Sequence, residues 1–91
     1  MAFNKISIDK NNWILIGDNV SEITFQNVGQ FGFYINFTSS TTPPTDEYGL
    51  VYPPDMSGEM KKPLVDMTQV TSPAYVWAKA ISQTTNIIVE Q

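Results

Sequence analysis

The chain has 91 residues, enough for one domain, and it contains no cysteine, histidine or arginine. Disulfides and thiolate metal sites are therefore excluded, and the usual general base near neutral pH is missing. Nine acids against five lysines give a net charge of −4, the wrong sign for binding nucleic acid phosphates. We therefore expect one acidic domain over residues 1–91 that is not an enzyme, has no catalytic or metal-binding residues and no cofactor, and does not bind nucleic acid.

Residue types favour β-sheet over helix, because nine Ile, seven Val and nine Thr stand against three Leu and four Ala. No window of eleven residues carries a helical apolar stripe free of turn residues. We also find no apolar run long enough for a signal peptide or a membrane span. The expectation is a protein made in a cytoplasm, with no membrane partner, whose Asn-x-Ser/Thr matches at Asn19 and Asn36 are chance.

In the first half of the chain, alternation of apolar and polar residues predicts several strands. Residues 1–12 are expected as an N-terminal arm in which Ile6 and Ile8 alternate with polar residues. Further strands are expected at residues 13–16, 20–26 and 31–37, with a hairpin connection at 27–30. Period-two spacing assigns four phenylalanines to the core: Phe25, Phe31, Phe33 and Phe37.

The second half alternates between polar loops and short strands. Residues 38–47 contain no apolar residue and are expected as an exposed loop, and residues 53–63 as a second irregular stretch. Strands are expected at 48–52, at the edge of a sheet at 64–70, and as a final antiparallel hairpin of 74–80 with 86–90. Six to eight short antiparallel strands predict an all-β domain, a small β-sandwich or jelly-roll-like barrel.

Two acidic segments are weighed as sites and rejected. Asp46 and Glu47 are adjacent in a polar loop, where nothing desolvates a carboxyl as glycoside hydrolysis requires. Residues 55–59 contain two acids but lack the alternating oxygen ligands of a calcium-binding loop. Neither segment predicts an active site or a metal site.

The candidate docking residues are aromatic: Trp13, Tyr34, Tyr75 and Trp77. Tyr34 lies opposite the phenylalanine face of its strand, and residues 74–80 are apolar on both faces. This pattern favours a face covered by another subunit or protein, while stacking on sugar rings is an alternative use of the same residues. Trp13 and Trp77 are also compatible with core positions in which their indole N–H groups are bonded.

Four segments together resemble the small β-sandwich structural proteins of tailed bacteriophage virions, the head decoration and fibre-type proteins. The segments are Phe25-Gln26-Asn27-Val28-Gly29, Pro43-Pro44, Tyr75-Val76-Trp77-Ala78-Lys79-Ala80 and Asn86-Ile87-Ile88-Val89-Glu90. The resemblance covers most of the chain from about Trp13 onward and carries over no catalytic residue.

The resemblance implies a non-enzymatic capsid decoration protein that stabilises the phage head from the virion surface. It also implies that the partners are phage capsid or tail proteins and that the chain forms a homo-oligomer, with a trimer favoured. A tail- or fibre-associated virion protein is the first alternative. A carbohydrate-binding β-sandwich module, with a glycan as partner, is the second.

Overall fold

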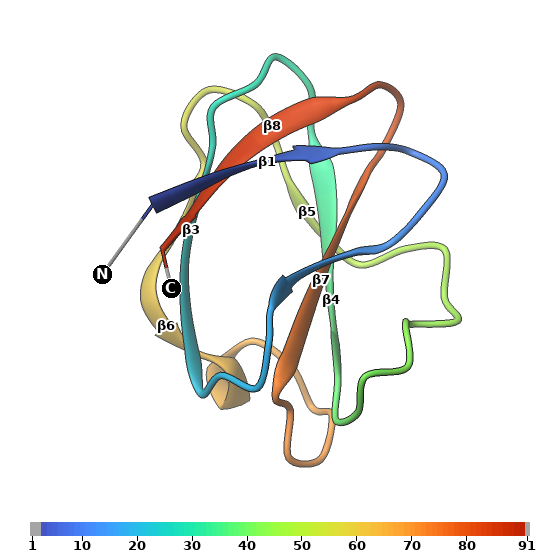
Figure 1. Ribbon diagram of the computed structural model, residues 1–91, viewed down its shortest axis with the longest axis vertical. Helices are drawn as coiled ribbons and strands as arrows, with labels where there is room; N and C mark the ends of the chain where they lie inside the picture. The colour runs from blue at the N-terminus through green and yellow to red at the C-terminus, as the bar shows by residue number, and fades with distance from the viewer. Residues whose placement is uncertain (1–2, 91) are drawn as a thin grey trace.

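The computed structural model describes residues 3–90, which form eight strands and one short 3-10 helix (Figure 1). The elements are β1 (Phe3–Ile8), β2 (Ile14–Gly17), β3 (Glu22–Asn27), β4 (Phe33–Thr38), β5 (Leu50–Tyr52), β6 (Gly58–Pro63), η1 (Leu64–Asp66), β7 (Tyr75–Ala80) and β8 (Thr85–Glu90). Within this range no helix is long and apolar enough to cross a membrane. The strands form two four-stranded antiparallel sheets, with orders β1-β8-β3-β6 and β2-β7-β4-β5.

The pairing of the strands is nested. β1 pairs with β8, β2 with β7, β3 with β6 and β4 with β5, while β3–β8 and β4–β7 pairs complete the two sheets. This is the strand order of a jelly roll. The structure therefore confirms an all-β sandwich of jelly-roll type.

The core lies between the two sheets and is formed by alternate residues of each strand. In β4, Phe33, Ile35 and Phe37 are buried, as the alternation predicts. Phe25 and Tyr52 pack against Phe33 with ring centroids 5.9 and 5.7 Å away, and their own centroids are 4.9 Å apart. These edge-to-face and stacked contacts join β3, β4 and β5 across the sandwich.

The core assignment of Phe31 is wrong. Phe31 is only half-buried and lies in the loop before β4, which begins at Phe33. Strict alternation ends where the strand ends, so a period-two pattern extended backwards across Gly32 assigns one residue too many to the core.

Asn27, the last residue of β3, is a fully buried polar residue at one end of the sandwich. Its side-chain amide donates to the carbonyls of Phe31 at 2.8 Å and Pro53 at 3.3 Å. Its side-chain oxygen accepts from the Gly29 N–H at 2.9 Å and the Thr85 hydroxyl at 3.2 Å. One side chain therefore ties together the β3–β4 loop, the β5–β6 loop and the start of β8.

Both predicted hairpins are wrong. β3 and β4 lie in different sheets, and so do β7 and β8, so their connections cross the sandwich instead of closing a hairpin. A short turn between two half-buried strands has the same sequence pattern in either case. The difference depends on long-range partners, here β8 for β3 and β2 for β7.

Residues 53–70 also differ from expectation. Residues 58–63, expected to be irregular, form β6, while the edge strand expected at 64–70 is replaced by η1 and a loop. Only Leu64 of that segment is fully buried, and its N–H donates to the carbonyl of Ser21 at 3.0 Å. Of the expected N-terminal arm, residues 3–8 form β1, an integral strand of the first sheet, and residues 1–2 lie outside the described residues.

Candidate functional site

The four predicted docking residues all lie on the outer face of the β2-β7-β4-β5 sheet. Register pairs Trp77 with Asn36, Tyr75 with Thr38 and Tyr34 with Lys79, so these side chains share one face. Trp13 precedes β2, and the Lys79 ammonium lies 5.5 Å from the centre of its ring. We call this surface, formed by Trp13, Tyr34, Tyr75, Trp77 and Lys79, the aromatic face.

The chain's own loop covers part of the aromatic face. The Trp13 indole N–H donates to the carbonyl of Asp46 at 2.9 Å, and the Asn36 amide donates to the carbonyl of Tyr48 at 3.1 Å. Trp77 is only 6% exposed, and its indole N–H donates to the Thr38 hydroxyl at 2.8 Å. Residues 39–49 therefore fold back along their own sheet, and Trp77 has little surface left for a partner.

Tyr34 and Tyr75 remain half-buried on this face. The ring of Tyr34 meets the ring of Tyr48 edge to face at 5.9 Å, and Tyr48 is 69% exposed. The accessible part of the aromatic face is thus centred on Tyr34, with the exposed ring of Tyr48 beside it.

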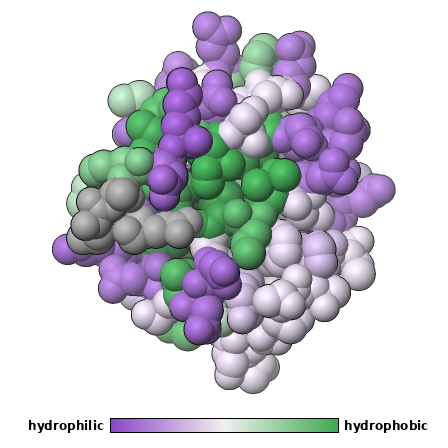
Figure 2. Space-filling model, in the orientation of Figure 1, coloured by the Kyte–Doolittle hydropathy of each residue, from purple (hydrophilic) through white to green (hydrophobic). Residues whose placement is uncertain are grey.

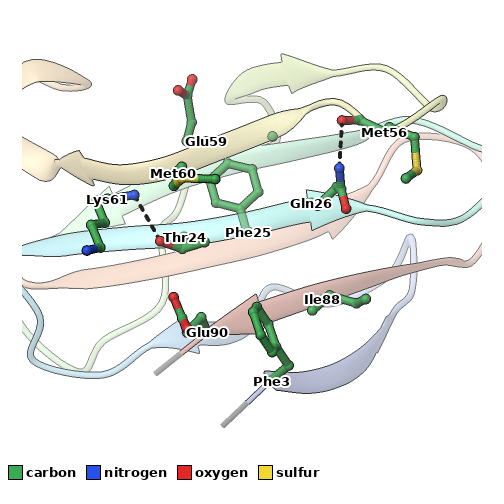
Figure 3. Close-up of a pocket in the computed structure, with 11 residues that line it drawn as sticks. Phe3, Thr24, Phe25, Gln26, Met56, Glu59, Met60, Lys61, Ile88 and Glu90 are labelled. Carbon is green, nitrogen blue, oxygen red and sulfur yellow. Dashed lines mark hydrogen bonds between the residues drawn. The ribbon is translucent and has the colours of Figure 1, made fainter. Parts of the chain in front are cut away.

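A second candidate surface lies on the outer face of the other sheet. It is a groove of about 640 Å³ that runs across β1, β8, β3 and β6. Figure 3 shows Phe3 at one side, Met60 and Lys61 at the other, and Thr24, Gln26 and Ile88 between them. Phe3, Met56 and Met60 are 68%, 63% and 81% exposed. The groove is lined by Phe3, Thr24, Phe25, Gln26, Met56, Gly58, Glu59, Met60, Lys61, Ile88 and Glu90.

Strand register builds the floor of the groove. Glu90 lies between Phe3 of β1 and Thr24 of β3, and Ile88 lies beside Gln26 in the next row. These positions are on the solvent side of strands whose intervening residues face the core. The floor is therefore mixed, with one isoleucine among neutral polar groups and a carboxylate.

The far wall of the groove depends on an irregularity in β6. The register with β3 shifts between Ile23 and Phe25, and Lys61 adopts a positive φ of 48°. At this bulge the Lys61 N–H donates to the Thr24 hydroxyl at 2.9 Å. The bulge anchors β6 to β3 at the point where Met60 stands 81% exposed beside the floor.

Close contact at the start of β6 fixes the other end of this wall. A Cβ on Gly58 would lie 2.0 Å from the Phe25 carbonyl oxygen, so no side chain fits there. Gln26 donates its amide to the carbonyl of Met56 at 3.3 Å, and Met56 has a φ of 73°. The β5–β6 turn is thereby held against β3, with the Met56 side chain at the mouth of the groove (Figure 3).

The side chains of the groove combine flexible apolar groups with polar ones. Its flexible methionines adapt to the shape of apolar side chains. Glu59 accepts a hydrogen bond from the Tyr52 hydroxyl at 3.0 Å; burial of the phenol, together with this carboxylate, raises the pKa of Tyr52 above the ordinary tyrosine range. Over residues 3–90 no three His, Cys, Asp or Glu side chains cluster to hold a metal ion.

Sequence reasoning missed the groove. The sequence pattern places Phe3 in an N-terminal arm, and it places Met56 and Met60 in a segment expected to be irregular. The two methionines do give a signal in the sequence. They are large apolar residues in a polar segment without alternation, so the pattern assigns them no place in the core and exposed positions are expected. Comparison of the chain with known protein families, curated proteins and solved structures gives no match.

Proposed function

We propose that the protein is a non-enzymatic structural protein that binds another protein through the groove. The observation that carries this proposal is the gathering of Phe3, Met56 and Met60, each more exposed than buried, around one concave surface. Exposed apolar side chains that surround a concave surface and are bordered by polar groups mark interaction sites in soluble domains. The mixed floor supplies hydrogen-bonding groups around the apolar contacts, as protein interfaces do.

The setting we propose is the bacteriophage virion, with the protein decorating and stabilising the head. The support is the resemblance of the sequence segments to virion structural proteins, together with the jelly-roll strand order, which is common in viral capsid proteins. A tail- or fibre-associated role uses the same groove against a different surface. Fold alone does not define function, so the binding partner is what the experiment must identify.

The test is co-sedimentation of the purified protein with heads and with tails of the phage that encodes it. Met60→Glu places a charge in the groove, and Val65→Glu is a matched control because Val65 is 70% exposed and does not line the groove. We expect the wild type and Val65→Glu to sediment with heads, and Met60→Glu to bind at least tenfold more weakly. Binding to tails alone would favour the fibre role, and equal binding by all three proteins would refute the groove.

Carbohydrate binding is a second candidate because the aromatic face presents Tyr34 and Tyr48 beside the Trp13–Lys79 pair. Exposed aromatic rings stack on the apolar faces of sugars. On a glycan array, Tyr34→Ala should then lose retention that Met60→Glu keeps. Absence of retention by the wild type on any glycan would remove this candidate.

A further inference from the structure

Each sheet of the sandwich has two edge strands, and three of these four edges are protected against pairing. β6 carries a bulge, two lysines and Pro63. β5 has only three residues and is followed by two prolines, and β2 has four residues with a register shift before Gly17. Charges, prolines, bulges and short length are the devices that prevent a free edge from joining another strand.

β1 has the fourth edge and carries only one of these devices, the charge of Lys5. It pairs with β8 in regular register at all six positions, without a proline or a shift, and Lys5 is its one charged residue. Alternate residues of such an edge strand direct their N–H and C=O groups away from the sheet. The edge of β1 is therefore a regular template for one more antiparallel strand.

Apolar surface adjoins this edge. Figure 2 shows hydrophobic atoms reaching the surface in the middle of the view, in the region that Figure 1 shows between β1 and β2. Ile6 of β1 and Ile14 of β2 are half-buried and pack against the core from this side. A strand added beside β1 would cover part of this apolar surface as well as pair with the backbone of β1.

We propose that the occupant is β1 of a second copy, which joins the two β1-β8-β3-β6 sheets into one eight-stranded sheet about a twofold axis. This inference rests on the proposed structural role and names the self-association that such a role uses. The strand is self-complementary in one register, and charge decides which register that is.

Residues with even numbers in β1 face the core, and residues with odd numbers face solvent. In a twofold antiparallel pair, the core-facing sides of both strands therefore lie on the same side of the sheet only if each residue pairs with one of the same parity, so that the two residue numbers have an even sum. A pair centred on Lys5 sets two ammonium groups opposite each other, which is destabilising. Within β1, a pair centred on Asn4 engages only residues 3–5, and a pair centred on Ser7 engages only residues 6–8. Centred on Ile6, the pair engages residues 4–8, sets Ile6 against Ile6 of the second copy and sets each Lys5 against Ser7. The Ile6-centred register avoids both defects.

This arrangement places the outer faces of both sheets on the same side of the dimer. The two grooves then point toward the same partner surface, and two linked contacts bind more tightly than one. Because the contact between copies is a five-residue strand pair, the interface is small, and the dimer forms in a concentration-dependent equilibrium.

The test is the solution mass of the full chain across a range of concentrations, by sedimentation equilibrium. We expect the wild type to pass from 10.2 kDa to twice that mass. Ser7→Lys sets lysines opposite each other and should weaken the dimer more than tenfold, whereas Ser82→Lys, the same change at an exposed turn residue, should not. The double variant Lys5→Glu, Ser7→Lys sets unlike charges opposite each other and should restore the dimer.

A wild type that stays monomeric at every concentration overturns the inference, and so does a dimer or trimer that Ser7→Lys leaves unchanged. Failure of the proposed function looks different. Met60→Glu lies outside the β1 pair, so it should dimerise normally and lose only binding to heads. Ser7→Lys should still bind heads through the groove of each single chain. It should lose only the additional affinity that comes from linking two grooves in one dimer.

Discussion

Replacing Asn27 with alanine removes a buried polar junction without touching either candidate surface. The substitution deletes four side-chain hydrogen bonds, to the carbonyls of Phe31 and Pro53, to the Gly29 N–H and to the Thr85 hydroxyl. Two of these bonds, at 2.8 and 2.9 Å, have good length, and two, at 3.3 and 3.2 Å, are long. Alanine leaves the Phe31 carbonyl, the Gly29 N–H and the Thr85 hydroxyl without this partner, in a site where Asn27 itself is 0% exposed. The Pro53 carbonyl keeps its hydrogen bond from the Ser57 hydroxyl.

The expected cost follows from the asymmetry of hydrogen-bond energetics. A typical bond contributes about 1 kcal/mol net, and a buried partner left unsatisfied costs about 1–3 kcal/mol. Counting the two short bonds fully and the two long ones weakly gives a loss of about 3–5 kcal/mol. A domain of this size has a free energy of unfolding of about 5–13 kcal/mol, so the variant should lose a large part of its stability.

The assay is urea unfolding followed by tryptophan fluorescence, with Trp13 and Trp77 as reporters. Asn36→Ala is the matched control, because Asn36 is only half-buried and makes two side-chain hydrogen bonds. Its amide donates to the carbonyl of Tyr48, and its side-chain oxygen accepts from the N–H of Phe37. We expect the control to cost about 1 kcal/mol. Equal losses from the two substitutions would refute the role assigned to Asn27.

Two further predictions concern backbone proximity and pH. Gly58→Ala should lower the free energy of unfolding by about 2–3 kcal/mol in thermal unfolding, because its Cβ would lie 2.0 Å from the Phe25 carbonyl oxygen. Gly32→Ala is the control: its Cβ would have its nearest contact at 3.2 Å, so it should cost less than about half of that. Equal costs would contradict the close approach of β6 to β3. The N–H groups of Asn11 and Asn12, each 2.8 Å from the Asp9 carboxylate, hold the pKa of Asp9 below its ordinary value. The stability that Asp9 contributes is therefore present above the ordinary carboxyl pKa and lost as pH falls through the lowered native pKa, so Asp9→Asn should flatten the acid limb of the stability profile. An NMR titration that places the pKa of Asp9 at or above the ordinary value would contradict this account.

The sequence predicts the fold well wherever alternation is strong. Phe33, Ile35 and Phe37 lie on the core side of β4, and Ile23 and Phe25 on the core side of β3, as their spacing indicates. Each of these strands has one side against the core and one side against solvent, which is the condition under which period two appears in a sequence.

Prediction from the sequence fails for segments that do not have one side against the core and the other against solvent. β6 shows no alternation of apolar and polar residues. A bulge interrupts the strand, and at Gly58 it packs against the backbone of β3 and not against side chains. An edge strand is expected at 64–70, yet this segment forms η1 and a loop in which Val65 and Val70 are exposed. The sequence predicts a turn at Asn27 because asparagine favours turns. Its burial depends on contacts with Pro53 and Thr85, which are far away in the chain.

Of the two candidate surfaces, the sequence predicts part of the aromatic face and none of the groove. The aromatic face could be assembled from the sequence because residue parity places Tyr34 opposite the phenylalanines and Tyr75 beside Trp77. Its coverage by residues 39–49 could not, because a polar loop gives no sign of where it folds. The groove combines β1, β8, β3 and β6, and only the long-range register brings Phe3 and Met60 to the same surface.

The nested strand order also governs how the chain folds. The β4–β5 pair closes the short segment 39–49, whereas β1 and β8 are joined only through residues 9–84. Loop closure costs entropy that grows with length, so we expect pairing to spread outward from β4–β5, each new pair shortening the loop that the next must close. Folding dominated by such distant contacts is slow, on the order of milliseconds to seconds. β1 then joins last, and a chain released with β1 unattached can capture β8 of a neighbour, so slow refolding at high concentration favours exchange of β1 between copies.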